Sequence, residues 1–254
     1  MRRPPRPRRI AVMLKTILYL HIAGGTAALL SMVIPLVTAK GARTHRRSGW
    51  VFVGGMTVVS ITALLLSGAR FFFDPRPDAK AFSLFLFYIA ILTGESVSSG
   101  VRALRAKDRA THATPWWDIG LASVLMLTSV GMAGYGFASG HMLFTWFSIL
   151  GFVNAAQALR YWLRPPTHRM HWWFRHMTSM LGSCIAAVTA FLVVNAPLAG
   201  VSRGSLIVWI TPGVVGGIGT RLWVAYYRRR FAGARVREGQ GFASPVLGSS
   251  VAAR

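Results

Sequence analysis

Seven long apolar runs dominate this sequence and limit the folds that it can adopt. The first run covers residues 16–38 and contains no Asp, Glu, Lys or Arg. A helix of about 20 mainly apolar residues is long enough to cross the hydrocarbon core of a bilayer, where a helix satisfies its own backbone polar groups. The sequence therefore predicts an all-α polytopic membrane bundle of seven transmembrane helices. The other six runs are 50–72, 81–101, 117–136, 142–163, 175–196 and 205–227.

The charge of the chain is strongly one-sided. Only six acidic residues accompany 29 lysines and arginines, so the formal net charge is +23. In a soluble protein such an excess would favour nucleic-acid binding, but here the cationic residues lie between apolar runs. We therefore expect no nucleic-acid partner and predict contacts with the bilayer and its anionic lipid headgroups. The residues expected at the headgroups are Arg43, Arg46, Arg47, Arg228, Arg229 and Arg230.

The connections between the runs differ in their basic content. Residues 39–49 and 102–116 hold four Lys or Arg each, whereas residues 137–141 hold none. Cytoplasmic connections are enriched in these residues, so both basic connections are expected in the cytoplasm of a bacterial inner (plasma) membrane. Seven spans then place the N-terminus outside and the C-terminus inside. The arginine-rich N-terminal segment argues against this orientation, and we follow the connections because several of them agree.

Both ends of the chain differ in composition from the apolar part. Residues 1–12 contain five Arg and three Pro, a composition that cannot bury a core, so we predict a disordered basic arm. The transmembrane domain is expected over residues 13–230, and a disordered basic tail over 231–254. The single cysteine, Cys184, excludes an intrachain disulfide and a cysteine-based metal cluster. Self-association of the chain is a further expectation.

Two stretches resemble the DUF2306-type predicted membrane proteins. Residues 18–72 contain LHIAGGTAALLS, THRRSGW and VGGMTVVSITALLL, and residues 168–195 read HRMHWWFRHMTSMLGSCIAAVTAFLVVN. The resemblance covers about a third of the chain. It implies a bacterial multi-pass membrane protein and little about chemistry, since the function of that family is unknown.

Four of the polar residues inside the predicted spans are candidates for lining a cavity: His21, Glu95, Asn154 and Gln157. Ionisable and amide side chains are costly in a membrane, so each marks a candidate site. Asn154 and Gln157 are three residues apart and share one helix face. Each residue also has a structural interpretation, because a histidine, carboxyl or amide in a span often hydrogen-bonds a neighbouring helix.

The histidines offer an alternative. A b-type haem needs two histidines that face each other from different helices as axial ligands. Under the predicted topology, His21 and His141 lie toward the outer face, and four further candidates lie toward the inner face. The inner candidates are His45, His168, His171 and His176. The competing interpretation places His45, His168 and His171 in loops, where they contact phosphates of the lipid.

Other chemistry has little support in the sequence. It contains no Walker loop, no HExxH, no Gly-x-Ser-x-Gly elbow and no EF-hand pattern, and its few carboxylates disfavour a two-metal hydrolase. No metal site is predicted, and enzymatic activity is left undecided. Three hypotheses follow: a small-molecule or proton-linked carrier or receptor with a polar intramembrane cavity, a redox protein with haem b, and an accessory protein that acts through helix contacts. We favour the first, because intramembrane polar groups commonly mark pathways.

Overall fold

The computed structural model describes residues 7–109 and 116–241, with side chains described for 9–109 and 116–232. Within these ranges the chain is all-α, and seven of its helices are long and apolar enough to cross a membrane. This confirms the predicted seven-helix bundle. The elements are α1 (Pro7–Val37), α2 (Arg43–Phe73), α3 (Pro77–Arg105), α4 (Trp116–Ser139), α5 (Met142–Leu163), α6 (His171–Asn195), the short 3-10 helix η1 (Ala196–Ala199) and α7 (Leu206–Gly241).

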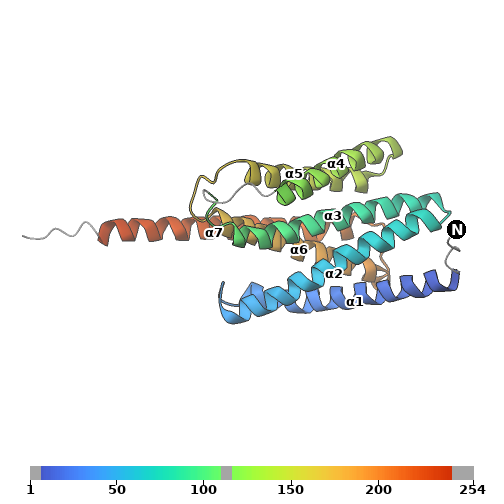
Figure 1. The fold of residues 1–254 in the computed structure, drawn as a ribbon, viewed down its shortest axis with the longest axis horizontal. Coiled ribbons are helices and arrows are strands. Elements are labelled where there is room, and N and C mark those ends of the chain that lie inside the picture. Colours follow the sequence, from blue (N-terminus) through green and yellow to red (C-terminus); the bar gives the residue numbers. More distant parts are fainter. Residues whose placement is uncertain (1–6, 110–115, 242–254) are drawn as a thin grey trace, which may run out of the picture.

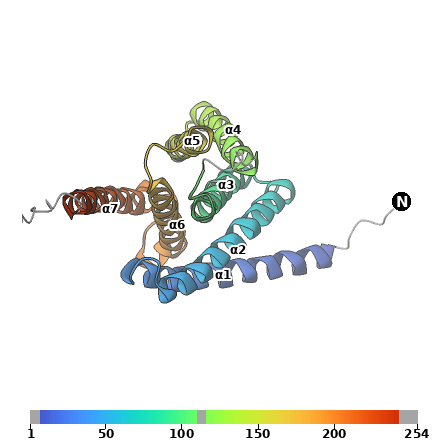
Figure 2. The same ribbon diagram turned by 60° about the vertical axis from the view of Figure 1, so that its left-hand side comes forward.

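Helix α3 occupies the centre of the bundle (Figures 1 and 2). It contacts α2, α4, α5 and α6. In its most apolar 18-residue stretch, 56% of the residues are buried, whereas in the corresponding stretch of α7 only 6% are buried. Helix α6 packs against α1, α3 and α7. Helices α1 with α2, and α4 with α5, form two antiparallel hairpins on either side of α3. The C-terminal part of α7 projects beyond the other helices.

An aromatic cluster attaches α5 and the start of α7 to α3. The ring of Phe85 on α3 stacks on Phe144 of α5, with 4.9 Å between the centroids. Trp209 of α7 meets Phe85 edge-on at 5.3 Å, and its indole nitrogen donates a 2.8 Å hydrogen bond to the carbonyl of Arg203. Aromatic pairs in such geometries are favourable beyond the area that they bury, so they hold α7 at its N-terminal end.

Several helices are longer than the apolar runs predicted. Helix α1 includes residues 7–12, which we expected to be disordered, and α7 continues to Gly241 through residues assigned to the disordered tail. Residues 43–49, expected in a loop, form the first turns of α2. The apolar runs in the sequence mark only the part of each helix that crosses the hydrocarbon core of the bilayer. Arginine is a good helix former, so the backbone hydrogen bonds continue beyond the apolar part. Residues 1–6 and 242–254 lie outside the described residues.

The basic connections gather at one end of the bundle. The ammonium of Lys40, between α1 and α2, lies 4.9 Å from the ring centroid of Trp223 on α7. The ammonium of Lys107, after α3, lies 4.6 Å from the ring centroid of Trp172 on α6. Both connections that we expected on the same membrane face are therefore on the same side of the bundle. We call this side the basic end and define it by these four residues.

Glycine allows α1 and α2 to approach closely. A Cβ atom added at Gly55 would lie 2.6 Å from the carbonyl oxygen of Gly24 and 3.1 Å from the Cβ of Ala28. Real Cβ atoms do not approach a backbone oxygen so closely, so the two backbones would have to separate. Small residues at such crossings are the usual means by which helices pack in lipid.

We predict that Gly55→Ala separates α1 from α2 and lowers the free energy of unfolding by about 1–3 kcal/mol, the usual cost of overpacking. Titration with a denaturing detergent in mixed micelles would measure the shift. Gly54→Ala is the matched control, because a Cβ at Gly54 meets nothing within 4 Å. Alanine also has the higher helix propensity, so this control should be neutral or slightly stabilising. Equal destabilisation by both changes would contradict the packing argument.

Candidate functional site

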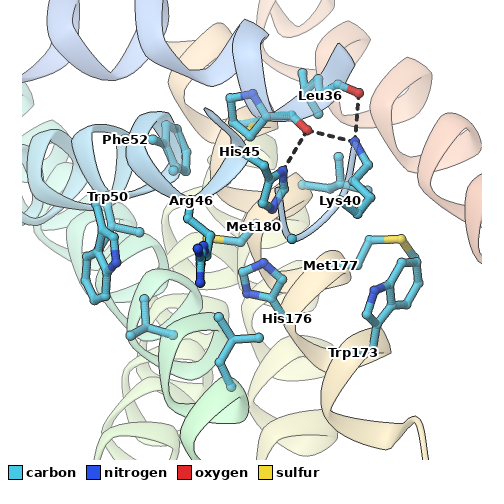
Figure 3. Close-up of a pocket in the computed structure, with 18 of the residues that line it drawn as sticks. Leu36, Lys40, His45, Arg46, Trp50, Phe52, Trp173, His176, Met177 and Met180 are labelled. Carbon is cyan, nitrogen blue, oxygen red and sulfur yellow. Dashed lines mark hydrogen bonds between the residues drawn. The ribbon is translucent and has the colours of Figure 1, made fainter. Parts of the chain in front are cut away.

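A pocket lies at the basic end of the bundle. It has a volume of about 540 Å³ and is lined by residues of α1, α2, α3, α6 and α7. This volume falls in the range of about 300–1,000 Å³ that is usual for small-molecule sites. Figure 3 shows that side chains from α2 and α6 form two of its walls.

The walls of the pocket are mainly apolar. Phe52 on α2 and Met177 and Met180 on α6 line it together with Trp173 and Trp50. Methionine side chains are flexible and polarizable, so they adapt to ligands of different shape. The pocket is therefore suited to a large apolar group rather than to a small hydrophilic solute.

The charged side chains that line the pocket are all cationic. They are Lys40, Arg46 and Lys107, and no Asp or Glu is among the described lining residues. Lys40 donates hydrogen bonds of 2.7 and 2.8 Å to the carbonyls of Pro35 and Leu36 at the end of α1. Partial burial lowers the pKa of its ammonium group. Arg46 is exposed, and its guanidinium lies beside the pocket (Figure 3).

Two histidines contribute imidazole rings to the pocket, His45 from α2 and His176 from α6. The Nδ1 atom of His45 lies 3.2 Å from the carbonyl oxygen of Pro35, and that of His176 lies 2.9 Å from the carbonyl oxygen of Gly100. A carbonyl oxygen only accepts, so in both rings Nδ1 carries the hydrogen. In the neutral rings, Nε2 is then left with its lone pair.

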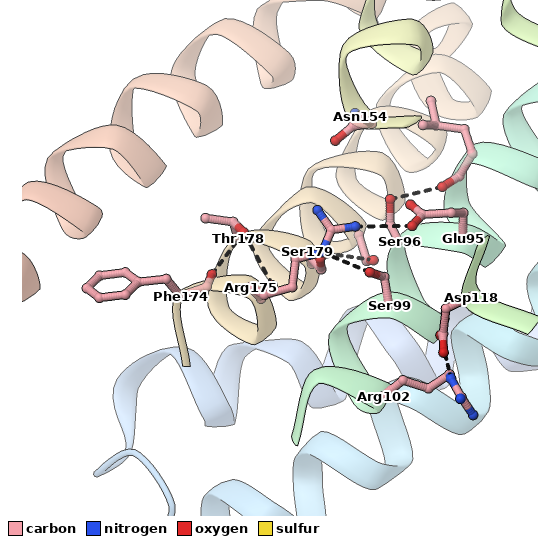
Figure 4. Close-up of polar contacts among 12 residues, drawn as sticks. Glu95, Ser96, Ser99, Arg102, Asp118, Asn154, Phe174, Arg175, Thr178 and Ser179 are labelled. Atoms are coloured by element: carbon pink, nitrogen blue, oxygen red, sulfur yellow. Dashed lines mark hydrogen bonds and ion pairs between the residues drawn. The ribbon is translucent and has the colours of Figure 1, made fainter. Parts of the chain in front are cut away.

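A second polar cluster lies deeper in the bundle, between α3 and α6 (Figure 4). The Arg175 guanidinium donates a 3.1 Å hydrogen bond to Oε1 of Glu95 and a 2.8 Å bond to the hydroxyl of Ser99. Glu95 is only 3% exposed, and the side chain of Arg175 is 10% exposed. The two opposite charges neutralise each other where water is scarce, which is the condition for burying them.

Two further contacts tie α4 and α5 to this region. Arg102 on α3 forms an ion pair with the buried carboxylate of Asp118 on α4. His171 receives a hydrogen bond at Nδ1 from the hydroxyl of Tyr161 on α5, at 3.0 Å, and its Nε2 donates to the carbonyl of Lys107, also at 3.0 Å. Both ring nitrogens of His171 are therefore occupied by protein groups.

The four predicted cavity residues do not line this pocket. His21 donates from Nδ1 to the hydroxyl of Thr62 at 2.9 Å, since that hydroxyl itself donates to a backbone carbonyl. Glu95 pairs with Arg175, the amide of Asn154 donates to a carbonyl within α5, and Gln157 is exposed. His21, Glu95 and Asn154 each bond to a different partner, and a cavity lined by all four residues stays a prediction.

The predicted histidine set divides in the same way. Of the six, only His45 and His176 line the pocket. His141 precedes α5 and packs 4.8 Å from the ring of Phe144, and His168 is an exposed loop residue hydrogen-bonded to Thr167. His45 and His171 are in the first turns of helices, not in loops as expected, because both helices begin several residues before their apolar runs.

The six arginines expected at lipid headgroups are all exposed. Arg43, Arg46 and Arg47 lie on the first turns of α2, and the other three lie in the C-terminal half of α7, where the Arg228 guanidinium is 5.7 Å from the ring centroid of Phe174. Headgroup binding stays a prediction, as does self-association. No group of three or more His, Cys, Asp and Glu is placed to hold a metal ion in the described residues.

Sequence reasoning missed Arg175 as the partner of Glu95. It stands at the first residue of a predicted apolar run, 175–196, where arginine commonly reaches the membrane surface. The signal was nevertheless present, because a carboxylate well inside a span requires a partner. Arg175 is the first residue of its run and could have been considered as that partner. The pocket itself has no sequence signal, because five different helices form it.

In comparisons with known proteins, no family model, curated protein or solved structure matches this chain. The resemblance to the DUF2306-type proteins therefore stays a prediction. The geometry of the pocket carries the functional argument.

We predict that Arg175→Met lowers the free energy of unfolding by about 3–5 kcal/mol, because it leaves the Glu95 carboxylate buried without its partner. The double variant Glu95→Gln with Arg175→Met should be more stable than Arg175→Met alone, since no charge then stays buried. Detergent-induced unfolding measures both. Ser96→Ala is the control, because Ser96 only donates within its own helix. Additive losses for the two substitutions would contradict a coupled pair.

Proposed function

We propose that this protein binds anionic amphiphilic small molecules in the pocket at the basic end, as a membrane carrier or receptor. One observation carries the proposal: the pocket has apolar walls, and all its described charged lining residues are cationic. The apolar part of such a ligand would contact Phe52 and Met180. Its carboxylate or phosphate would lie near Arg46 and Lys107.

Electrostatics supports the choice of an anionic ligand over a neutral one. A cationic residue near the membrane surface contributes about 1 kcal/mol to the binding of an anionic group. Arg46 presents a fork of donors that suits a carboxylate or phosphate. An acidic residue in the lining would oppose such a ligand, and none is described there. The proposal thus keeps the class of function that the sequence favoured and moves the binding site to another place.

The membrane and the orientation belong to the same proposal. The chain is a multi-pass membrane protein by the length and composition of its helices, and we assign it to a bacterial inner membrane. The basic end is assigned to the cytoplasm, because Lys and Arg are enriched there. The N-terminus then lies outside and the C-terminus inside. The exposed arginines of α2 and α7 would contact anionic headgroups on the cytoplasmic side.

A photoreactive long-chain carboxylic acid tests ligand binding. In nanodiscs, we expect it to label the peptides of α2 and α6 that contain Phe52 and Met180. Arg46→Ala and Lys107→Ala should each weaken labelling about fivefold, the equivalent of about 1 kcal/mol. Arg105→Ala is the matched control, because Arg105 is exposed at the same end and does not line the pocket.

The methyl ester of the same acid should compete poorly for the site, because it lacks the anionic group. Equal competition by acid and ester, or labelling that does not depend on Arg46 and Lys107, would contradict the proposal.

Cysteine accessibility tests the orientation. In a Cys184→Ser background, Asp78→Cys and Ser139→Cys place thiols at the end opposite the basic end, and Arg47→Cys and Arg105→Cys place them at the basic end. In right-side-out spheroplasts, a membrane-impermeant maleimide should label only the first two. The reverse pattern would assign the basic end to the outside and contradict the orientation.

A further inference from the structure

The arrangement of His45 and His176 resembles that of metal-bound histidines. Each ring is held by a hydrogen bond from Nδ1 to a backbone carbonyl, of Pro35 and Gly100 respectively. In metal sites the second ring nitrogen commonly makes such a bond, which orients the ring and makes the ligating nitrogen more basic. The two rings come from different helices and line the same pocket. Figure 3 shows them next to each other.

Two imidazoles are too few to hold a bare metal ion. A structural zinc site uses four protein ligands and a catalytic site uses three, and the described residues offer no group of three or more suitable side chains. A metalloporphyrin removes this difficulty, because the ring itself supplies four nitrogens to its iron. Two axial imidazoles then complete a six-coordinate site. The histidine pair therefore selects a haem over a free ion.

The rest of the pocket fits the other parts of a haem. Its volume of about 540 Å³ provides space for a large flat ring. Phe52 and Met180 supply apolar contacts for the faces and edges of the ring. Haem b also carries two propionate groups, and Arg46 and Lys107 lie at the pocket, where their cationic groups would pair with these carboxylates.

From these observations we propose that the pocket is a binding site for b-type haem, with the Nε2 atoms of His45 and His176 as the axial ligands of the iron. The inference rests on the proposed function, because a haem is itself an anionic amphiphile, and it adds the ligation of iron by two named residues. Such a site holds low-spin iron with both axial positions occupied by protein.

Optical spectroscopy of the full-length protein tests this assignment. Protein purified from haem-replete cells, or reconstituted with haemin in nanodiscs, should show a Soret band and, after reduction with dithionite, the sharp α and β bands of a low-spin haem. His45→Gln and His176→Gln retain a donor for the backbone carbonyl but no imidazole. Each should reduce low-spin haem at least about tenfold, and after removal of unbound haemin, added imidazole should restore the low-spin spectrum of the protein-bound haem.

Two matched variants control for general effects of losing a histidine. His168→Gln changes an exposed histidine, and His21→Gln changes one that is bonded to Thr62; neither lines the pocket, and both should keep the full spectrum. Circular dichroism and gel filtration establish that each variant is folded. The proposal is overturned if the wild-type protein shows no low-spin haem spectrum after haemin titration and removal of unbound haemin. It is also overturned if a low-spin spectrum of full intensity survives in both His45→Gln and His176→Gln.

The result can be separated from the test of ligand binding. Photolabelling of haem-free protein by the long-chain acid depends on Arg46 and Lys107 and does not require the imidazoles. Loss of the haem spectrum with labelling retained would overturn the haem assignment and leave the proposed function standing. Loss of both would overturn both. If both hold, haemin should displace the photolabel.

Discussion

Polar contacts between α3 and α6 hold the basic end of this protein together. Lipid gives two apolar helices no hydrophobic reason to associate, so packing and hydrogen bonds must supply the attraction. Arg175 binds Glu95, and the next residue, His176, donates to the carbonyl of Gly100. Consecutive residues of a helix point about 100° apart. These two contacts therefore fix the rotation of α6 about its axis as well as its distance from α3.

The rotation of α6 in turn determines the pocket. Arg175 is directed toward Glu95 (Figure 4), and His176, Met177 and Met180, which follow it on α6, line the pocket. The buried ion pair thus has a structural role that positions the binding residues, although a carboxylate inside a span first suggested a place on a transport path. Buried pairs contribute little net stability compared with apolar replacements, so their value here is in specifying one arrangement of the helices.

The two proposals for the pocket share most of their physical basis. Apolar walls and a cationic rim suit any anionic amphiphile, whether it is a fatty acid, a lipid or a porphyrin with propionates. Only the orientation of His45 and His176, both held through Nδ1, distinguishes a haem from the others. Arg46 and Lys107 can be substituted without changing the histidine pair. The contributions of charge and of iron ligation to binding can therefore be measured separately.

The order and helical nature of the seven spans were predictable from the sequence, because apolar length and the need to satisfy backbone polar groups in lipid are local properties. The common location of the basic connections also followed, since alternating helices return the chain to the same side. Helix ends were less predictable, because α2 begins at Arg43, before its apolar run begins at residue 50. Which helices become neighbours decides the pairing of Glu95 with Arg175, 80 residues apart, and the presence of His45 and His176 at one pocket. Side-chain packing between distant segments establishes those neighbours, and a linear pattern of apolar runs carries no record of it.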